Sequence, residues 1–104
     1  MSRRCDVLVI GAGVIGCAIA RELAKYKIET VLLDKETDVG SGVSKGNSGV
    51  IHTGLYYPKG SLKAKLCVEG RLMFPELCKQ LEVPYELCGK HVIARNEEEL
   101  KDLE

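Results

Sequence analysis

The chain has 104 residues, in which 15 lysines and arginines balance 15 aspartates and glutamates. This length suits one domain with one modest core. With no net charge and only four tyrosines, one phenylalanine and no tryptophan, the composition argues against nucleic-acid binding.

A strand, a glycine turn and a helix are predicted at the start of the chain. Residues 5–10 form a nearly continuous apolar run that is rich in β-branched residues, which is typical of a strand buried on both faces of a parallel sheet. After the turn, apolar residues recur at helical spacing until Tyr26 or Lys27. A second buried-strand pattern follows at residues 30–34. Strand, helix and strand in this order predict a right-handed crossover and an α/β fold class.

The remainder of the chain reads as a loop, a helix and a short mixed segment. Residues 36–60 are rich in glycine and polar residues and have no helical period, which is typical of a functional loop. Ser61 is a candidate helix cap, and an apolar face follows from Leu62 to Leu81. Gly70 and Pro75 predict a bend or a break before Pro75. The last expected elements are short strands at 85–88 and 91–94 and an acidic helix from Glu97.

Two features of the sequence indicate the cellular compartment of the protein: its five cysteines and the uncharged run near the N-terminus. The cysteines are odd in number and form no C-x-x-C pair, so we expect reduced thiols, no zinc site and no redox dithiol. The uncharged run from Val7 to Ala20 is too short to span a membrane, and its glycines weaken a signal-peptide reading. We expect a cytoplasmic protein with no transmembrane segment, either free or peripheral to the membrane, and no metal site.

Gly11, Gly13 and Gly16 fit the G-x-G-x-x-G pattern between the first strand and the first helix. In this context Gly11 permits the tight turn, Gly13 lets the backbone approach a pyrophosphate, and Gly16 allows the helix to lie close to the sheet. Helix N–H groups favour the anion, and Asp34, at the end of the second strand, can hold ribose hydroxyls. Dinucleotide binding is therefore predicted, although an aspartate here suits NAD at least as well as FAD.

The loop and the helix that follow resemble the D-amino-acid-oxidase-like branch of FAD-dependent oxidoreductases. The stretches that look like L-2-hydroxyglutarate dehydrogenases and oxidases are residues 40–44, 47–58, 61–70, 88–90 and 92–94. Residues 44–48 and 96–99 are also similar to anaerobic-type, FAD-linked glycerol-3-phosphate dehydrogenases. The resemblance implies a Rossmann-like, glutathione-reductase-like FAD-binding unit followed by the start of a substrate domain.

The resemblance also implies a function and a set of cofactor-binding residues. The expected activity is oxidation of a CH–OH group on a small anionic substrate, with FAD as cofactor and with oxygen, a quinone or a partner protein as electron acceptor. Gly11, Gly13, Gly16, Asp34 and Lys35 would hold the ADP half of FAD. The residues that would line the pyrophosphate and the approach to the flavin ring are Ser44, Asn47, Ser48 and Gly49.

His52, Tyr56 and Tyr57 are the candidate catalytic and substrate residues that the resemblance implies. His52 would lie beside the isoalloxazine as the catalytic residue, or would be a neutral histidine bonded inside the loop. In aerobic glycerol-3-phosphate dehydrogenases the similar stretch carries an arginine suited to phosphate, whereas this chain has Tyr56 and Tyr57. An L-2-hydroxyglutarate substrate is therefore favoured, and glycerol-3-phosphate stays open as the alternative, because some anaerobic-type enzymes also lack that arginine. The alternative for both tyrosines is a purely structural role, in which they pack beneath the loop.

Enzymes of this branch are several hundred residues long, so the resemblance implies an N-terminal fragment. We expect residues 1–82 to be the first part of an FAD-binding domain and residues 83–104 to begin the substrate domain and to end in a truncated helix. Two other classes remain open. One is a non-catalytic nucleotide-binding piece that acts with a partner chain, and the other is an NAD-dependent dehydrogenase.

Overall fold

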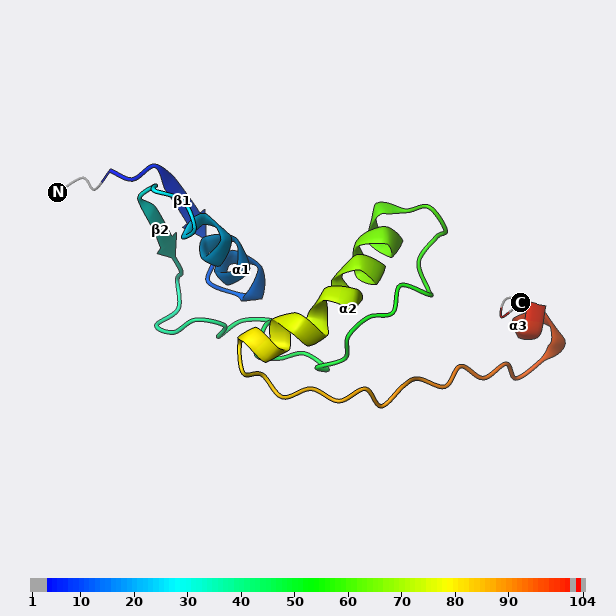
Figure 1. The fold of residues 1–104 in the computed structure, drawn as a ribbon. Coiled ribbons are helices and arrows are strands. Elements are labelled where there is room, and N and C mark those ends of the chain that lie inside the picture. The colour runs from blue at the N-terminus through cyan, green and yellow to red at the C-terminus, as the bar shows by residue number, and fades with distance from the viewer. Residues whose placement is uncertain (1–3, 102, 104) are drawn as a thin grey trace. The chain divides into compact units, whose positions relative to one another are not determined.

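The computed structural model describes residues 4–101 and 103 of the chain. Its elements are β1 (Val7–Ile10), α1 (Val14–Leu23), β2 (Thr30–Leu33), α2 (Leu62–Gln80) and α3 (Glu97–Lys101) (Figure 1). The chain divides into two compact units, with the boundary between Val50 and Ile51. The first unit contains both strands and α1, and the second contains α2 and α3.

The first unit is the strand–helix–strand crossover that the sequence predicts. β1 and β2 pair in parallel, in a register that runs from Val7 opposite Thr30 to Ile10 opposite Leu33. Val9 lies on the face covered by α1, because a Cβ added at Gly16 of that helix would be 3.5 Å from Val9 Cγ1. On the other face Leu8 is 49% exposed and Ile10 is 80% exposed, so the prediction of a strand buried on both faces is wrong for the described residues, which cover β1 on one face. The α/β fold class and the Rossmann-like start are confirmed.

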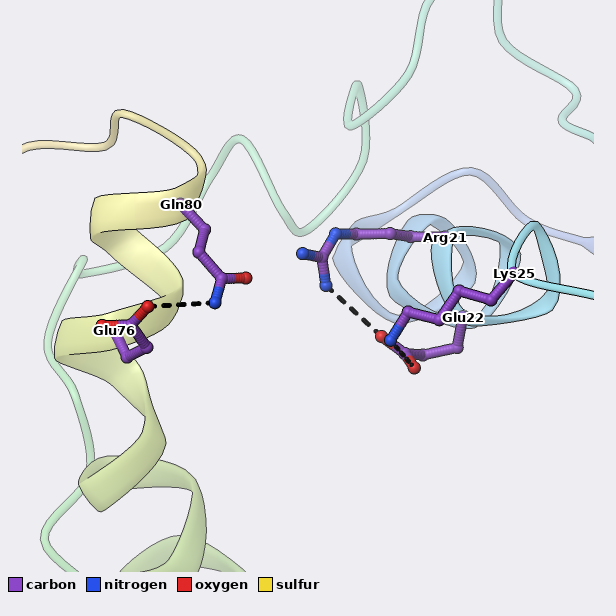
Figure 2. A network of polar contacts seen from close by, with 5 residues as sticks. All are labelled: Arg21, Glu22, Lys25, Glu76 and Gln80. Carbon is purple, nitrogen blue, oxygen red and sulfur yellow. Dashed lines mark hydrogen bonds and ion pairs between the residues drawn. The ribbon is translucent and has the colours of Figure 1, made fainter.

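α1 ends at Leu23, earlier than the predicted end at Tyr26 or Lys27. Its last turn tightens, because Lys25 N–H donates to Glu22 O and Tyr26 N–H donates to Leu23 O, each across three residues. Figure 2 shows Glu22 on this helix, where its carboxylate receives hydrogen bonds from Lys25 Nζ at 2.5 Å and from Arg21 Nη1 at 3.3 Å. The Lys25 hydrogen bond lowers the pKa of Glu22, but such exposed pairs add little to stability.

α2 is one continuous helix, so of the two predicted alternatives, a bend or a break before Pro75, the break is wrong. Ser61 caps it as expected, with its Oγ accepting from Ala64 N–H at 3.1 Å. Pro75 removes the donor that would bond the carbonyl of Arg71, but Arg71 is exposed and the helix continues past the proline to Gln80. Near the C-terminal end Gln80 Nε2 donates to Glu76 Oε1 at 3.1 Å, one helical turn away (Figure 2).

No strand forms at residues 85–88 or 91–94, so those two predictions are also wrong. A strand is defined by backbone pairing with a neighbour, and within residues 83–96 no such pairing is present. The acidic helix is confirmed as α3. In its first turn, Glu99 N–H donates a hydrogen bond to Asn96 Oδ1 at 2.8 Å. The proposed domain boundary at residue 82 stays a prediction.

None of the helices in residues 4–101 is both long enough and apolar enough to cross a bilayer.

Candidate functional site

A groove of about 530 Å³ lies over the glycine turn of the first unit. It begins at the carboxyl end of β1 and follows the start of α1, and one stretch of the loop after β2 closes its side. Among the predicted cofactor residues, the groove brings together Gly11, Gly13, Gly16, Ser44 and Asn47. Ligands bind at this edge of the sheet in open α/β folds, outside the carboxyl ends of the strands.

Gly16 lets the first turn of α1 lie directly against the glycine turn. A Cβ at this position would be 1.8 Å from the carbonyl oxygen of Gly11, a distance that no pair of non-bonded atoms can adopt. Gly11 itself has a φ of +102°, which residues with side chains rarely adopt. The two glycines therefore set the course of the backbone at the floor of the groove.

The N-terminus of α1 opens into the groove and is held by Ser44. Gly13 occupies the cap position and offers no side chain, and Ser44 Oγ accepts from Val14 N–H at 2.9 Å. A Cβ at Gly13 would be 3.1 Å from the same Ser44 Oγ. Backbone donors at a helix start favour anions, so this narrow cradle, which a side chain would fill, fits a pyrophosphate.

Asp34 fastens the glycine turn to the end of β2. Its Oδ2 accepts from Ala12 N–H at 2.5 Å and its Oδ1 accepts from Glu36 N–H at 2.8 Å. These backbone hydrogen bonds, that of Glu36 foremost, lower the pKa of Asp34, so its carboxylate is charged at neutral pH. Because a carboxylate has two oxygens with several lone pairs, Asp34 can keep these bonds and still accept from ribose hydroxyls.

The other predicted residues of this loop lie outside the groove. Lys35 is 88% exposed at its side chain and lies 3.7 Å from Glu36 Oε1. Ser48 and Gly49 do not line the groove, although Gly49 is fixed by a 2.8 Å hydrogen bond from its N–H to Asn47 Oδ1. Asn47 in turn donates from Nδ2 to the carbonyl of Ser44 at 2.7 Å. The loop is thus internally bonded around Asn47.

The candidate catalytic residue His52 lies in the second unit and is paired with Tyr57. His52 Nδ1 and the Tyr57 hydroxyl are 2.9 Å apart, and the two rings are nearly parallel, with centroids 6.3 Å apart. Lys63 Nζ lies 4.2 Å from the centre of the Tyr57 ring. Tyr56 makes a similar cation–π contact with another lysine, because Lys90 Nζ lies 5.0 Å from its ring centre. Both tyrosines therefore contact lysines, as aromatic faces commonly do.

Sequence reasoning missed the backbone groups and the pairings that hold the site. The donors here are the backbone N–H groups of Ala12 and Val14, and the residue type does not reveal which backbone groups take part in a site. The pairing of His52 with Tyr57 spans five residues in a loop, so no regular period could reveal it. The glycine pattern did locate the turn, and the cap preference of Ser61 did locate the start of α2.

The chain is similar to flavin-dependent enzymes over nearly all of its length. A family model described as FAD dependent oxidoreductase matches residues 6–104. A glycerol 3-phosphate dehydrogenase of Caloramator mitchellensis is 52% identical over 98 residues, which are 94% of this chain and 20% of that protein. A mitochondrial L-2-hydroxyglutarate dehydrogenase of Dictyostelium discoideum is 44% identical over 101 residues, which are 95% of this chain and 23% of that protein.

A solved structure shares the fold as well. The dithionite-reduced L-alpha-glycerophosphate oxidase from Mycoplasma pneumoniae with FAD bound matches with a TM-score of 0.70 and 38% sequence identity. The match covers 76% of this chain and 21% of that one. This chain thus spans about a fifth of the length of these relatives.

Proposed function

The chain belongs to the family of FAD-dependent oxidoreductases, and from that premise we propose that its first unit holds the ADP half of FAD. The observation that carries the proposal is the groove over Gly11, Gly13 and Gly16, in which the absence of a side chain at Gly13 leaves the backbone at the start of α1 open to a ligand. The pyrophosphate would replace or join Ser44 Oγ at Val14 N–H. Asp34 and Lys35 would contact the ribose.

The loop after β2 would continue the site toward the flavin ring. Ser44 and Asn47 already line the groove, and Ser48 and Gly49 follow them directly. Their small size and polar atoms allow a close approach of backbone and hydroxyl groups to the cofactor. FAD, once bound, supplies the hydride acceptor, whereas the protein supplies position and charge. An NAD-dependent dehydrogenase, which Asp34 alone left open, does not agree with membership of an FAD-dependent family.

We propose that the protein as a whole oxidises the CH–OH group of a small anionic substrate. His52 would lie beside the flavin ring and contact the reacting part of the substrate. Tyr56 and Tyr57, each with a lysine against its ring, would lie near the substrate's anionic groups. The electron acceptor would be oxygen, a quinone or a partner protein, and a cytoplasmic location, free or peripheral to the membrane, stays a prediction.

Cofactor identity is the first test. We expect the protein, produced at its full natural length, to be yellow and to release FAD on denaturation, because the groove suits a pyrophosphate and the following loop suits a flavin. Absorbance spectroscopy and chromatography of the extract identify the nucleotide. Extraction of NAD, or tighter binding of NAD than of FAD in titrations, would contradict the proposed site. Flavin binding without any substrate oxidation would favour the non-catalytic piece that acts with a partner chain.

The substrate is the second test, and two candidates compete. The Tyr56–Tyr57 pair and the lack of an arginine in residues 36–60 favour L-2-hydroxyglutarate, because phosphate dianions commonly recruit bidentate arginines. The 52% identity to a glycerol 3-phosphate dehydrogenase favours glycerol-3-phosphate. Mixing the oxidised flavoprotein with each substrate under anaerobic conditions should bleach the flavin faster with L-2-hydroxyglutarate. Faster bleaching by glycerol-3-phosphate would reverse this preference and leave the cofactor assignment unchanged.

A further inference from the structure

His52 and Tyr57 form a bonded pair in the loop that precedes α2. The Tyr57 hydroxyl is 2.9 Å from His52 Nδ1, and the rings lie at 10° to one another. In a neutral imidazole one ring nitrogen carries the proton and the other is an acceptor. The partner of one nitrogen therefore decides what the other nitrogen offers to a ligand.

Tyr57 is held in place from two sides. Its backbone N–H donates to Gly54 O at 3.4 Å, and Gly54 lies so close to α2 that an added Cβ would be 3.0 Å from Val68 Cγ2. On the ring face, Lys63 Nζ lies 4.2 Å from the centroid. Lys63 belongs to the first turn of α2, which Ser61 caps. α2 thus contacts the ring of Tyr57 through Lys63 and lies against the turn that Tyr57 closes through Gly54.

We propose that Tyr57 is a positioning residue that keeps the proton of neutral His52 on Nε2. The positive charge of Lys63 beside the ring makes the phenol oxygen a poorer acceptor, so the hydroxyl donates to Nδ1 instead of accepting from it. Nε2–H is then the group that His52 presents as a donor. This inference rests on the proposed function, in which His52 contacts the reacting part of the substrate, whose alcohol oxygen can accept a hydrogen bond from Nε2–H.

The proposed tautomer of His52 bears on which group of the protein accepts the proton of the substrate alcohol. A histidine with its proton on Nε2 and with Nδ1 accepting from a hydroxyl has no free lone pair to take the proton of a substrate alcohol directly. His52 thus orients the reacting part of the substrate as a hydrogen-bond donor, and another group of the protein accepts the alcohol proton.

Nitrogen chemical shifts of histidine test the proposal without any catalytic readout. The protein at its full natural length is produced with ¹⁵N-labelled histidine, and His52→Asn identifies the His52 signals. At a pH where the ring is neutral, we expect a protonated Nε2 and an unprotonated Nδ1. In Tyr57→Phe the ratio of this tautomer to the other should fall about five-fold, the effect of losing one ordinary hydrogen bond. Lys63→Met should change the ratio in the same direction by a smaller factor.

Tyr56→Phe is the matched control, because Tyr56 lies against Lys90 instead of His52, and it should leave the ratio unchanged. A wild-type His52 with its proton on Nδ1 overturns the proposal, as does an unchanged ratio in Tyr57→Phe. If Tyr57→Phe does not fold, the wild-type shifts and Lys63→Met decide the matter in the same way. Absence of bound FAD would refute the proposed function and would leave these nitrogen shifts as a separate result.

Discussion

Replacing Gly16 with alanine is expected to destabilise the first unit by about 3 kcal/mol or more and to release the flavin. Alanine is the better helix former by about 1 kcal/mol, so helix propensity alone predicts the opposite sign. The new Cβ, however, would be 1.8 Å from the carbonyl oxygen of Gly11. That oxygen belongs to the backbone, so it cannot swing aside as a flexible side chain can. Either α1 moves away from β1 or the glycine turn opens.

Gly70→Ala provides the matched control for this result. Gly70 also lies inside a helix, α2, and a Cβ there would have open space within 4 Å. We expect this variant to be stabilised by about 1 kcal/mol and to keep its flavin. Thermal unfolding followed by circular dichroism, together with the flavin content of the purified proteins, compares the two. Equal stability of Gly16→Ala and Gly70→Ala would show that α1 does not lie as close to Gly11 as the structure places it.

The first unit was predictable from the sequence because its signals are local. Buried-strand runs, helical spacing and three glycines each act within a few residues, and they agree on one crossover. The same approach failed at Pro75, because the local effect of a proline on its own hydrogen bond does not by itself decide whether a long helix continues. It failed again at residues 85–94, because β-type residues form a strand only beside a second strand, and their composition says nothing of a neighbour.

The candidate site was predictable only in part for a similar reason. The pattern located Gly11, Gly13 and Gly16, since the glycines themselves mark the turn. Nothing in residue type shows that Ser44, thirty positions along the chain, accepts from Val14 N–H. Loop contacts of this kind depend on the course of the backbone between the two residues, which a sequence without regular periodicity does not specify.

Gly13→Val is expected to weaken FAD binding by about 10- to 100-fold while the first unit stays folded. Gly13 has a φ of −75° and a ψ of −177°, an extended conformation that valine adopts without strain. Its Cβ would be 3.1 Å from Ser44 Oγ, the end of a loop side chain that can move. The branched side chain would then occupy the cradle at Val14 N–H, where the pyrophosphate must approach the backbone.

The same substitution at Gly46 separates this effect from a general intolerance of the loop. Gly46 lacks a positive φ, and a Cβ there would meet nothing within 4 Å, so Gly46→Val should retain wild-type flavin. Isothermal titration of FAD into each apoprotein measures the affinities, and circular dichroism shows whether the fold is kept. If folded Gly13→Val binds FAD as tightly as Gly46→Val, the pyrophosphate does not lie at the start of α1. Because both variants add the same side chain, any difference between them comes from the position of Gly13 at the helix N-terminus.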